Sequence, residues 1–366
     1  MTTSLFQPYD LPTLTLPNRI ALAPMTRYRA DNRGVPTGDQ AVFYAQRSSA
    51  GILVSEGIWP SVVGQTFHTI PGLVTEEQVA GWRMVTASVH GAGGRIFAQL
   101  MHGGRNGHPL NNLDGLHPLA PSAVATTEPL HTPFGKTEPV TPIAMTLADI
   151  RQAIDDYVAA ARNAVRAGFD GVELHSANSY LPHQFLADNT NLRTDAYRSR
   201  SRFVVEVVEA VAAAVGAARL GLRISPGNPE NSMVEADPAP VYRSLVDTLD
   251  PLGLAYLHVT DNPDYPALTD LRPRWSGALI GNTGEHRVTT AADAVRLLRE
   301  GVDIVSFGRP FIANPDLPRR LATGASLAEI DAARLYTPGW RGYIDYPAMT
   351  VVSQAEADSP MSVVAS

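Results

Sequence analysis

Short apolar runs alternate along the chain with longer segments in which apolar residues recur at helical spacing. Continuous apolar runs bounded by turn residues are typical of parallel strands that are covered on both faces. Eight runs of this kind are present, at residues 19–25, 52–58, 95–101, 171–175, 220–225, 254–260, 277–282 and 303–308. The pattern therefore predicts eight buried strands.

Helical spacing fills most of the intervals between these runs. The clearest helix begins after Thr146, because Asp149 three residues later completes a capping box, and Gly168 is a plausible stop. Further helices are predicted within residues 75–94, 201–216 and 289–301.

Strands alternating with helices over more than about 250 residues indicate an α/β protein with a (β/α)₈ TIM barrel. A doubly wound open sheet is the competing topology. Residues 102–146 are rich in Pro, His, Asn and Gly, and we expect them to form a long excursion after strand 3 that covers one end of the barrel. We expect one catalytic barrel domain over residues 1–350 and a flexible tail over residues 351–366.

Composition excludes several classes of function. The 366 residues include 44% hydrophobic and 18% charged residues, as in a globular protein, and the formal net charge is −7 without a basic run. Nucleic acid and anionic membranes are therefore not expected partners. The chain has no cysteine, which excludes disulfides and thiolate chemistry. We find neither a secretory signal nor an apolar stretch of about 20 residues, so we expect a cytoplasmic protein.

Polar or glycine residues stand at nearly every strand exit. In a barrel of this kind the carboxyl ends of the strands meet at one face, where the chemistry takes place. The exits carry Pro24, Met25, Thr26, Glu56, Gly57, Gln99, His102, His175, Asn178, Tyr180, Arg223, Gly281, Asn282, Gly308 and Arg309. Each of these residues alone has an ordinary structural explanation, but the barrel places them on one rim.

The character of this rim predicts a phosphorylated planar cofactor. Gly281-Asn282 and Gly308-Arg309 follow strands seven and eight, where barrels commonly bind phosphate. Gln99 and Arg223 suit a flat heterocycle with alternating donors and acceptors, and Thr26 adds a hydroxyl. Because neither a P-loop nor a dinucleotide fingerprint follows a strand, flavin mononucleotide (FMN) fits better than a Rossmann-bound nicotinamide.

The chain resembles the old yellow enzyme family of FMN-dependent ene-reductases. The resemblance covers nearly the whole chain, from about Leu5 to Tyr346. It is carried by the segments NRIALAPMTRYRA, GWRMVTASVHGAGGRIFAQLMHGGR, GFDGVELHSANSYLPHQFL, NLRTDAYRSRSRF, GLRISP, FGRPFIANPDL and YTPGWRGYIDYP. It implies a tightly but non-covalently bound FMN, NADPH or NADH as a transient hydride donor, and activated alkenes as substrates: enones, enals, maleimides and nitroalkenes.

The resemblance also implies roles for single residues. His175 and Asn178 would bind the carbonyl or nitro oxygen of the substrate, and Tyr180 would donate the proton. Thr26 would contact the flavin, as in the subgroup that has Thr rather than Cys there. Cofactor contacts are further implied for Pro24, Met25, Gly57, Gln99, His175, Arg223, Gly281, Asn282, Gly308 and Arg309, and substrate contacts for Met101 and Tyr346.

Three departures from the family pattern bear on substrate choice. A Gly-Gly-Ser-containing stretch usual after Tyr197 is replaced directly by residues 198–201, which shortens the loop. Met101 stands where many relatives have Trp, and Gly103-Gly104 replaces a more usual Val-Gly pair. We expect Met101 to change the size of the pocket and the substrate preference, and the shortened loop to bear on packing, while the core residues of the site stay in place.

Other classes of function stay open on the sequence alone. A metal-dependent barrel lyase or hydrolase would use His102, His108, His175, His183 and Glu56 as ligands. A non-catalytic flavin-binding protein is a second alternative, and an oxidoreductase acting on nitro compounds or nitrate esters is a third. The sequence does not choose between NADH and NADPH, or between a monomer and a homodimer.

Overall fold

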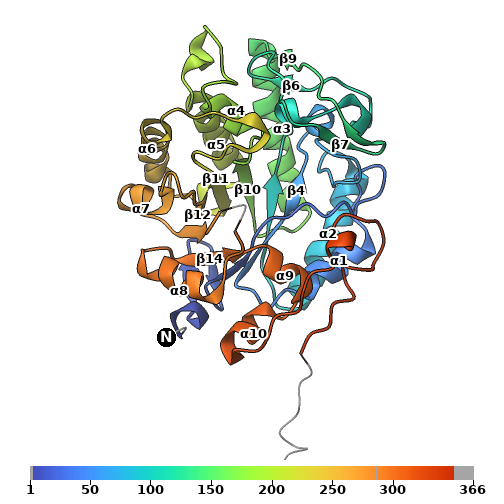
Figure 1. The fold of residues 1–366 in the computed structure, drawn as a ribbon, viewed down its shortest axis with the longest axis vertical. Helices are drawn as coiled ribbons and strands as arrows, with labels where there is room; N and C mark the ends of the chain where they lie inside the picture. The colour runs from blue at the N-terminus through green and yellow to red at the C-terminus, as the bar shows by residue number, and fades with distance from the viewer. Residues whose placement is uncertain (1–2, 285–286, 350–366) are drawn as a thin grey trace, which may run out of the picture.

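Eight parallel strands close into a barrel in chain order, which confirms the predicted (β/α)₈ fold (Figure 1). The structure is a computed structural model that describes residues 3–284 and 287–349, so the predicted tail at 351–366 lies outside the described residues. Every predicted strand is present, with ends shifted by a few residues. The barrel strands are β3 (Ile20–Leu22), β4 (Ile52–Ile58), β5 (Ile96–Leu100), β10 (Gly171–Ser176), β11 (Leu220–Ile224), β12 (Tyr256–Thr260), β13 (Leu279–Asn282) and β14 (Ile304–Phe307).

The strands are continuous apolar runs because both of their faces are covered. Every residue of β4, β5, β10, β11 and β12 is buried. Outward side chains pack under helices, whereas inward side chains fill the barrel interior. The helices are α1 (Gly38–Ala45), α2 (Glu76–Gly91), α3 (Leu147–Arg166), α4 (Leu181–Leu186), α5 (Arg202–Val215), α6 (Pro238–Leu249), α7 (Ala267–Leu271), α8 (Ala291–Arg299), α9 (Arg309–Ala313) and α10 (Leu317–Thr323).

The predicted capping box starts α3 as expected. The Thr146 hydroxyl accepts from the backbone N–H of Asp149 at 3.2 Å, and the Asp149 carboxylate accepts from the backbone N–H of Thr146 at 2.8 Å. The helices predicted within residues 75–94, 201–216 and 289–301 correspond to α2, α5 and α8. No helix among the residues that the structure describes is both long and apolar enough to cross a membrane.

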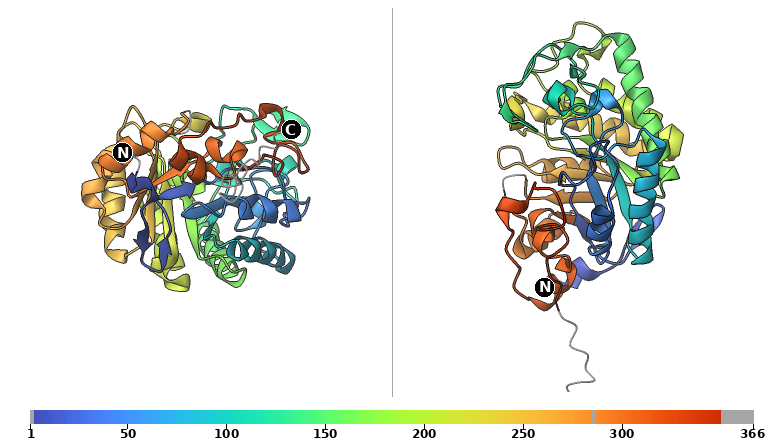
Figure 2. Two further views of the ribbon diagram at one scale, coloured as in Figure 1. Left: turned by 90° about the horizontal axis from the view of Figure 1, so that it is seen from below. Right: turned by 90° about the vertical axis from the view of Figure 1, so that its right-hand side faces the viewer.

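An N-terminal hairpin closes the amino-terminal end of the barrel. Its strands β1 (Tyr9–Leu11) and β2 (Leu14–Leu16) are antiparallel, and this N-terminal part of the chain is drawn in dark blue in Figure 2. Leu11 and Leu16 pack against inward-facing residues near the strand starts, such as Phe97 and Tyr256. This end is therefore sealed by apolar contacts, and the polar strand ends are left to the opposite face.

The segment after β5 forms the predicted excursion over that opposite face. It contains two small sheets, one of β6 (Leu119–Ala120) with β9 (Ile143–Ala144) and one of β7 (Leu130–Thr132) with β8 (Gly135–Thr137). Figure 1 shows β6, β7 and β9 together at one end of the molecule. Residues 129–132 of this segment border the main pocket described below.

Candidate active site

A pocket of about 860 Å³ opens at the carboxyl ends of the strands. This volume is within the range of roughly 300–1,000 Å³ typical of cofactor and small-molecule sites. Most of the predicted site residues border it: Pro24, Met25, Thr26, Gln99, Met101, His175, Asn178, Tyr180, Arg223, Asn282, Gly308 and Arg309. The barrel thus brings together residues that are nearly 300 positions apart in the chain.

Two predicted glycines do not border this pocket. A Cβ atom added at Gly57 would lie 2.4 Å from the sulfur of Met101, so Gly57 makes room for that side chain. A Cβ atom at Gly281 would meet Leu268 at 2.8 Å and Val302 at 3.1 Å, so this position faces the outer helical layer. The cofactor contacts predicted for these two glycines stay predictions.

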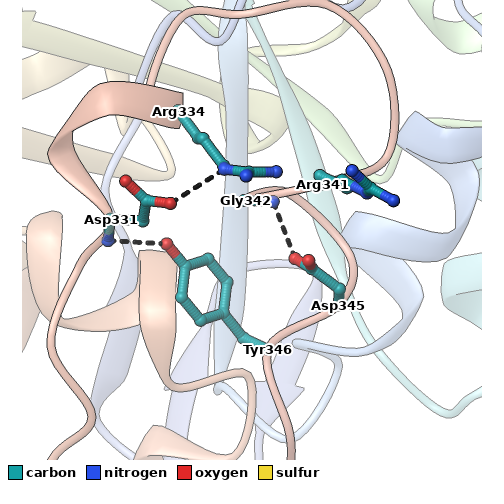
Figure 3. A pocket seen from close by; sticks show the side chains of 6 residues that line it. All are labelled: Asp331, Arg334, Arg341, Gly342, Asp345 and Tyr346. Carbon is teal, nitrogen blue, oxygen red and sulfur yellow. Dashed lines mark hydrogen bonds and ion pairs between the residues drawn. The ribbon is translucent and has the colours of Figure 1, made fainter.

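The prediction that Tyr346 lies at the substrate mouth is wrong. Tyr346 borders a separate pocket of about 330 Å³ near the C-terminal segment, where its hydroxyl accepts from the backbone N–H of Asp331 at 3.0 Å (Figure 3). Tyr336, ten residues earlier in the same motif, borders the main pocket instead. The motif YTPGWRGYIDYP contains three tyrosines, and its pattern does not indicate which of them faces the site.

Tyr336 is held at the mouth by contacts on both sides. Arg27 donates to the backbone carbonyl of Leu335 at 3.3 Å, and Arg29 donates to that of Arg334 at 3.0 Å. The Tyr336 ring meets the ring of Tyr28 edge-on, with centroids 5.6 Å apart. The buried arginines thus fix the segment that carries Tyr336, although its ring is 63% exposed.

A tight turn after β10 places His175, Asn178 and Tyr180 on one wall of the pocket. Asn178 and Ser179 both have left-handed backbone conformations, with φ of 52° and 63°. Such conformations are costly for residues other than glycine, and they persist where surrounding contacts impose them. Here the N–H of Asn178 donates to the Ser225 hydroxyl at 2.8 Å, and the N–H of Ser179 donates to Nδ1 of His183 at 3.0 Å.

Two of these side chains, His175 and Tyr180, lie close to each other in the wall. The rings of His175 and Tyr180 have centroids 4.7 Å apart. Burial, followed by the charge of Arg223, lowers the pKa of His175 well below its usual value, so the imidazole is neutral at neutral pH. Its Nδ1 is buried and has no hydrogen-bond partner among the described residues. A buried polar atom without a partner is unfavourable, so this position suits a bound ligand.

The pocket floor is formed by inward-facing polar residues of the strands. Gln99 of β5, Arg223 of β11 and Asn282 of β13 are at most 8% exposed. Arg223 donates to Nε2 of His258 at 2.7 Å and to the hydroxyl of Thr260 at 2.8 Å. Gln99 donates to the Glu173 carboxylate at 2.8 Å. These bonds hold a planar amide and a planar guanidinium in fixed positions beneath the cavity.

Several pocket residues were missed by the sequence analysis because they lie in loops. Glu230 borders the pocket in the loop after β11, and its carboxylate accepts from the amide of Asn178 at 3.4 Å. Phe67 and His68 also border the pocket, and their rings contact that of Tyr28 with centroids 5.4 and 5.6 Å apart. A single Glu in a polar loop carries no periodic signal, so its position facing the wall could not be read from the pattern.

The residues of the pocket fit FMN. The floor provides amide and guanidinium donors for a flat polar ring, and the hydroxyl of Thr26 lies at the same cavity. Gly308 and Arg309 border it at the end of β14, where a backbone without a side chain next to a cation suits a phosphate. Thr289 and Asn282 add further polar groups on the same side of the barrel.

Comparisons with known proteins identify the family. The sequence profile of the NADH:flavin oxidoreductase / NADH oxidase family matches residues 4–328. A probable flavin mononucleotide-dependent alkene reductase from Leishmania infantum is 41% identical over 346 residues, which cover 91% of this chain and 94% of that protein.

Solved structures show the same fold at similar identity. An old yellow enzyme homologue from Zymomonas mobilis superposes with a TM-score of 0.90 at 38% identity, covering 94% of this chain and all of that one. Morphinone reductase in complex with tetrahydroNAD has a TM-score of 0.89 at 41% identity, covering 95% of this chain and 98% of that one.

The fold and site define a flavin-binding barrel oxidoreductase. The chain belongs to the NADH:flavin oxidoreductase / NADH oxidase family, and within it to the old yellow enzyme group of ene-reductases. The expectation of an FMN-dependent enzyme that uses NAD(P)H to reduce alkenes is confirmed at this level.

The histidines of the metal-site alternative have other roles in this structure. Nδ1 of His102 accepts from the backbone N–H of Gly104, and Nδ1 of His108 accepts from that of Leu110, both at 3.1 Å. Nδ1 of His183 accepts from the backbone N–H of Ser179 in the turn after β10. Within residues 3–284 and 287–349, no group of three His, Asp or Glu side chains could hold a metal ion.

Proposed function

We propose that His175 and Asn178 bind the activating oxygen of an enone, enal, maleimide or nitroalkene, and that Tyr180 donates the proton that completes the reduction. FMN, when bound, would supply the hydride chemistry between NAD(P)H and the β-carbon of the alkene. The protein contributes the position of the substrate, the stabilisation of charge and the proton.

The oxygen-binding role follows from the chemistry of the substrate. When a hydride reaches the β-carbon, negative charge develops on the activating carbonyl or nitro oxygen. Two fixed N–H donors stabilise that charge as it forms, as in an oxyanion hole. The neutral imidazole of His175 and the amide of Asn178 are two such donors; His175 stands near the end of β10 and Asn178 in the rigid turn that follows it.

The proton has to reach the α-carbon on the same substrate. A tyrosine hydroxyl keeps its proton at neutral pH and can donate it to a carbanion-like carbon. The ring of Tyr180 lies next to that of His175, so a substrate whose oxygen is held by His175 also lies near the Tyr180 hydroxyl. This proximity is the observation on which the proposal chiefly rests.

Further residues bind the cofactor in this proposal. Gln99, Arg223 and Thr26 contact the flavin ring, with Pro24 and Met25 beside it, and Asn282, Gly308 and Arg309 contact the phosphate. Met101 borders the pocket beside the wall: it packs with Trp59 and Ile70, and Tyr180 packs against the same cluster. Membership of the Thr-containing subgroup, a monomer or homodimer and a cytoplasmic location stay predictions.

NAD(P)H and the alkene use the same cavity in turn in this proposal, so turnover follows ping-pong kinetics. An anaerobic absorbance titration tests the proposal. The FMN-loaded protein is reduced with NADPH or NADH and then mixed with a panel of enones, maleimides and nitroalkenes. Reoxidation by activated alkenes, but not by an unactivated alkene of the same size, supports it. Equal reoxidation by both would contradict the role of the oxygen-binding pair.

A further inference from the structure

A chain of buried polar side chains runs across the barrel interior, directly beneath the pocket floor. It comprises Glu173 of β10, His258 of β12 and Ser306 of β14, and none of the three borders the cavity. All three have 0% exposure. They connect three residues that do border the cavity, namely Gln99, Arg223 and Asn282.

The direction of each hydrogen bond in this chain follows from the carboxylate. Burial acts to raise the pKa of Glu173, but His258 and Arg223 outweigh it, so the pKa falls below its ordinary value and the group is ionised. An ionised carboxylate only accepts. Gln99 therefore donates its amide N–H to one oxygen at 2.8 Å, and His258 donates Nδ1–H to the other at 2.9 Å.

The directions of the remaining hydrogen bonds between these buried side chains follow from the tautomer of His258. Burial, followed by the charge of Arg223, lowers the pKa of His258 to about 4, so the ring is neutral and its Nε2 carries a lone pair. This lone pair accepts from Arg223 at 2.7 Å and from the Ser306 hydroxyl at 2.9 Å. Ser306 in turn accepts from the amide of Asn282 at 3.0 Å.

Two consequences follow for the pocket floor. Because Glu173 takes an N–H of Gln99, the amide oxygen of Gln99 is turned away from Glu173 and is available on the cavity side. The Glu173 carboxylate also lies one histidine ring away from Arg223, so its negative charge offsets the guanidinium charge below the cavity. With His258 neutral, Glu173 and Arg223 are the two charged members of the chain.

We propose that Glu173 is a positioning residue that fixes the orientation of the Gln99 amide and tempers the charge of Arg223, and thereby sets both the affinity for FMN and its reduction potential. The proposal assumes that FMN binds over this floor. It assigns a role to a residue that contacts neither substrate nor cofactor.

The test is Glu173→Gln, which keeps the size of the side chain but introduces a donor and removes the charge. A glutamine cannot accept from both neighbours without turning the Gln99 amide, so we expect the dissociation constant of oxidised FMN to rise roughly tenfold. Loss of the negative charge favours the reduced, anionic cofactor. We expect the ratio of affinities for reduced and oxidised FMN to rise about tenfold, which for a two-electron couple is a potential about 30 mV more positive.

A double-variant cycle separates the two effects. In a Gln99→Ala background the amide is absent, so adding Glu173→Gln should no longer weaken FMN binding, whereas the potential should still become more positive. Loss of the potential shift in that background would contradict the charge effect. If Glu173→Gln weakened FMN binding in the Gln99→Ala background by as much as it does alone, the orientation effect would be contradicted.

A second buried Glu–His pair in the protein provides a matched control. Glu235 accepts from the N–H of Gly227 at 2.6 Å and from Tyr242 at 2.8 Å, and it lies 3.4 Å from Nε2 of His183. Glu235 does not border the pocket. Glu235→Gln should therefore lower thermal stability while leaving the FMN potential unchanged. An equal potential shift in both variants would show a general effect of buried charge and would overturn the proposal.

A measurement on the unaltered protein covers the case in which Glu173→Gln does not fold. Nitrogen-15 NMR of labelled histidine should show His258 as a neutral Nδ1–H imidazole from about pH 5 to pH 8. A protonated ring, or the Nε2–H tautomer, would contradict the hydrogen-bond directions. The proposal would then fail even if the protein reduces alkenes as proposed.

Discussion

The floor and the mouth of the pocket are built in different ways. The floor residues Gln99, Arg223 and Asn282 stand on barrel strands, are nearly inaccessible and are tied to a buried chain of hydrogen bonds. The mouth residues Tyr336 and Glu230 stand in loops. Rigid strands suit a partner that never changes, here the cofactor, whereas loops suit substrates that vary. The wall of His175, Asn178 and Tyr180 combines the two: His175 stands on β10, and Asn178 and Tyr180 stand between β10 and α4, in a turn that hydrogen bonds to Ser225 and His183 hold in place.

The largest effect is expected from removing the hydroxyl of Tyr180, the proton donor that we propose for the wall. Tyr180→Phe should slow reoxidation by cyclohexenone by roughly 10²–10⁴-fold, because general acid catalysis is lost. Reduction by NADPH needs no proton from Tyr180 and should stay nearly unchanged. Anaerobic stopped-flow absorbance measures the two half-reactions separately. Tyr28→Phe, a tyrosine at the mouth, is the control and should affect neither strongly. Equal slowing of both half-reactions by Tyr180→Phe would exclude its assignment as donor.

The oxygen-binding pair comes next in expected effect. Asn178→Ala should raise the barrier to alkene reduction by about 3 kcal/mol, the typical cost of losing one such donor. The variant should also bind phenols more weakly, since a phenol oxygen resembles the charged oxygen of the transition state. His175→Ala should do the same. Spectral titration with a phenol measures the affinity, and an affinity unchanged in both variants would rule out the anchoring role.

Substitutions at the mouth should have smaller effects than those in the wall, and they should change KM more than kcat. Tyr336→Ala removes an aromatic contact worth about 0.5–1.5 kcal/mol, so KM for a bulky enone should rise by up to roughly tenfold with a smaller change in kcat. Tyr346→Phe is the matched comparison, because that hydroxyl bonds to Asp331 outside the pocket. It should leave KM unchanged. If steady-state kinetics showed a larger rise in KM for Tyr346→Phe than for Tyr336→Ala, Tyr346 would be the residue at the mouth.

Glu230 should give the smallest effect. Its carboxylate lies next to the amide of Asn178 and opposes a negative charge bound there. Glu230→Gln should therefore tighten the binding of phenolate ligands a few-fold, about 0.5–1 kcal/mol for a partly solvated charge. The affinity for a neutral ligand of the same shape serves as the control. Weaker phenolate binding would mean that Glu230 supports the site rather than opposing the charge.

The difference between the floor and the mouth also explains how much of the fold and of the site could be predicted from the sequence. The barrel and its strand ends follow from continuous apolar runs, and a polar residue within such a run marks a position near the active face. Gln99, His175 and Arg223 were found in this way. The same reasoning could have found Glu173 and His258, which interrupt the runs GVELH and LAYLHVT. They were passed over because a buried polar residue one layer below the floor looks like an ordinary core residue.

The mouth could not be predicted because loop conformation is set by contacts that are distant in sequence. Tyr336 faces the pocket because Arg27 and Arg29, some 300 residues earlier, bind the carbonyls around it. Neither arginine stands out in a pattern of polar and apolar positions. A resemblance between motifs identified the segment but did not settle which tyrosine of the segment turns inward.

The central claim is that the strand ends bind FMN with the wall of His175, Asn178 and Tyr180 facing the bound substrate. Anaerobic titration of the purified protein tests it most directly. The account predicts a yellow protein whose flavin absorbance is bleached by NADPH or NADH and restored by one equivalent of cyclohexenone. A colourless protein that takes up no added FMN, or a reduced flavin that cyclohexenone fails to reoxidise, would contradict it.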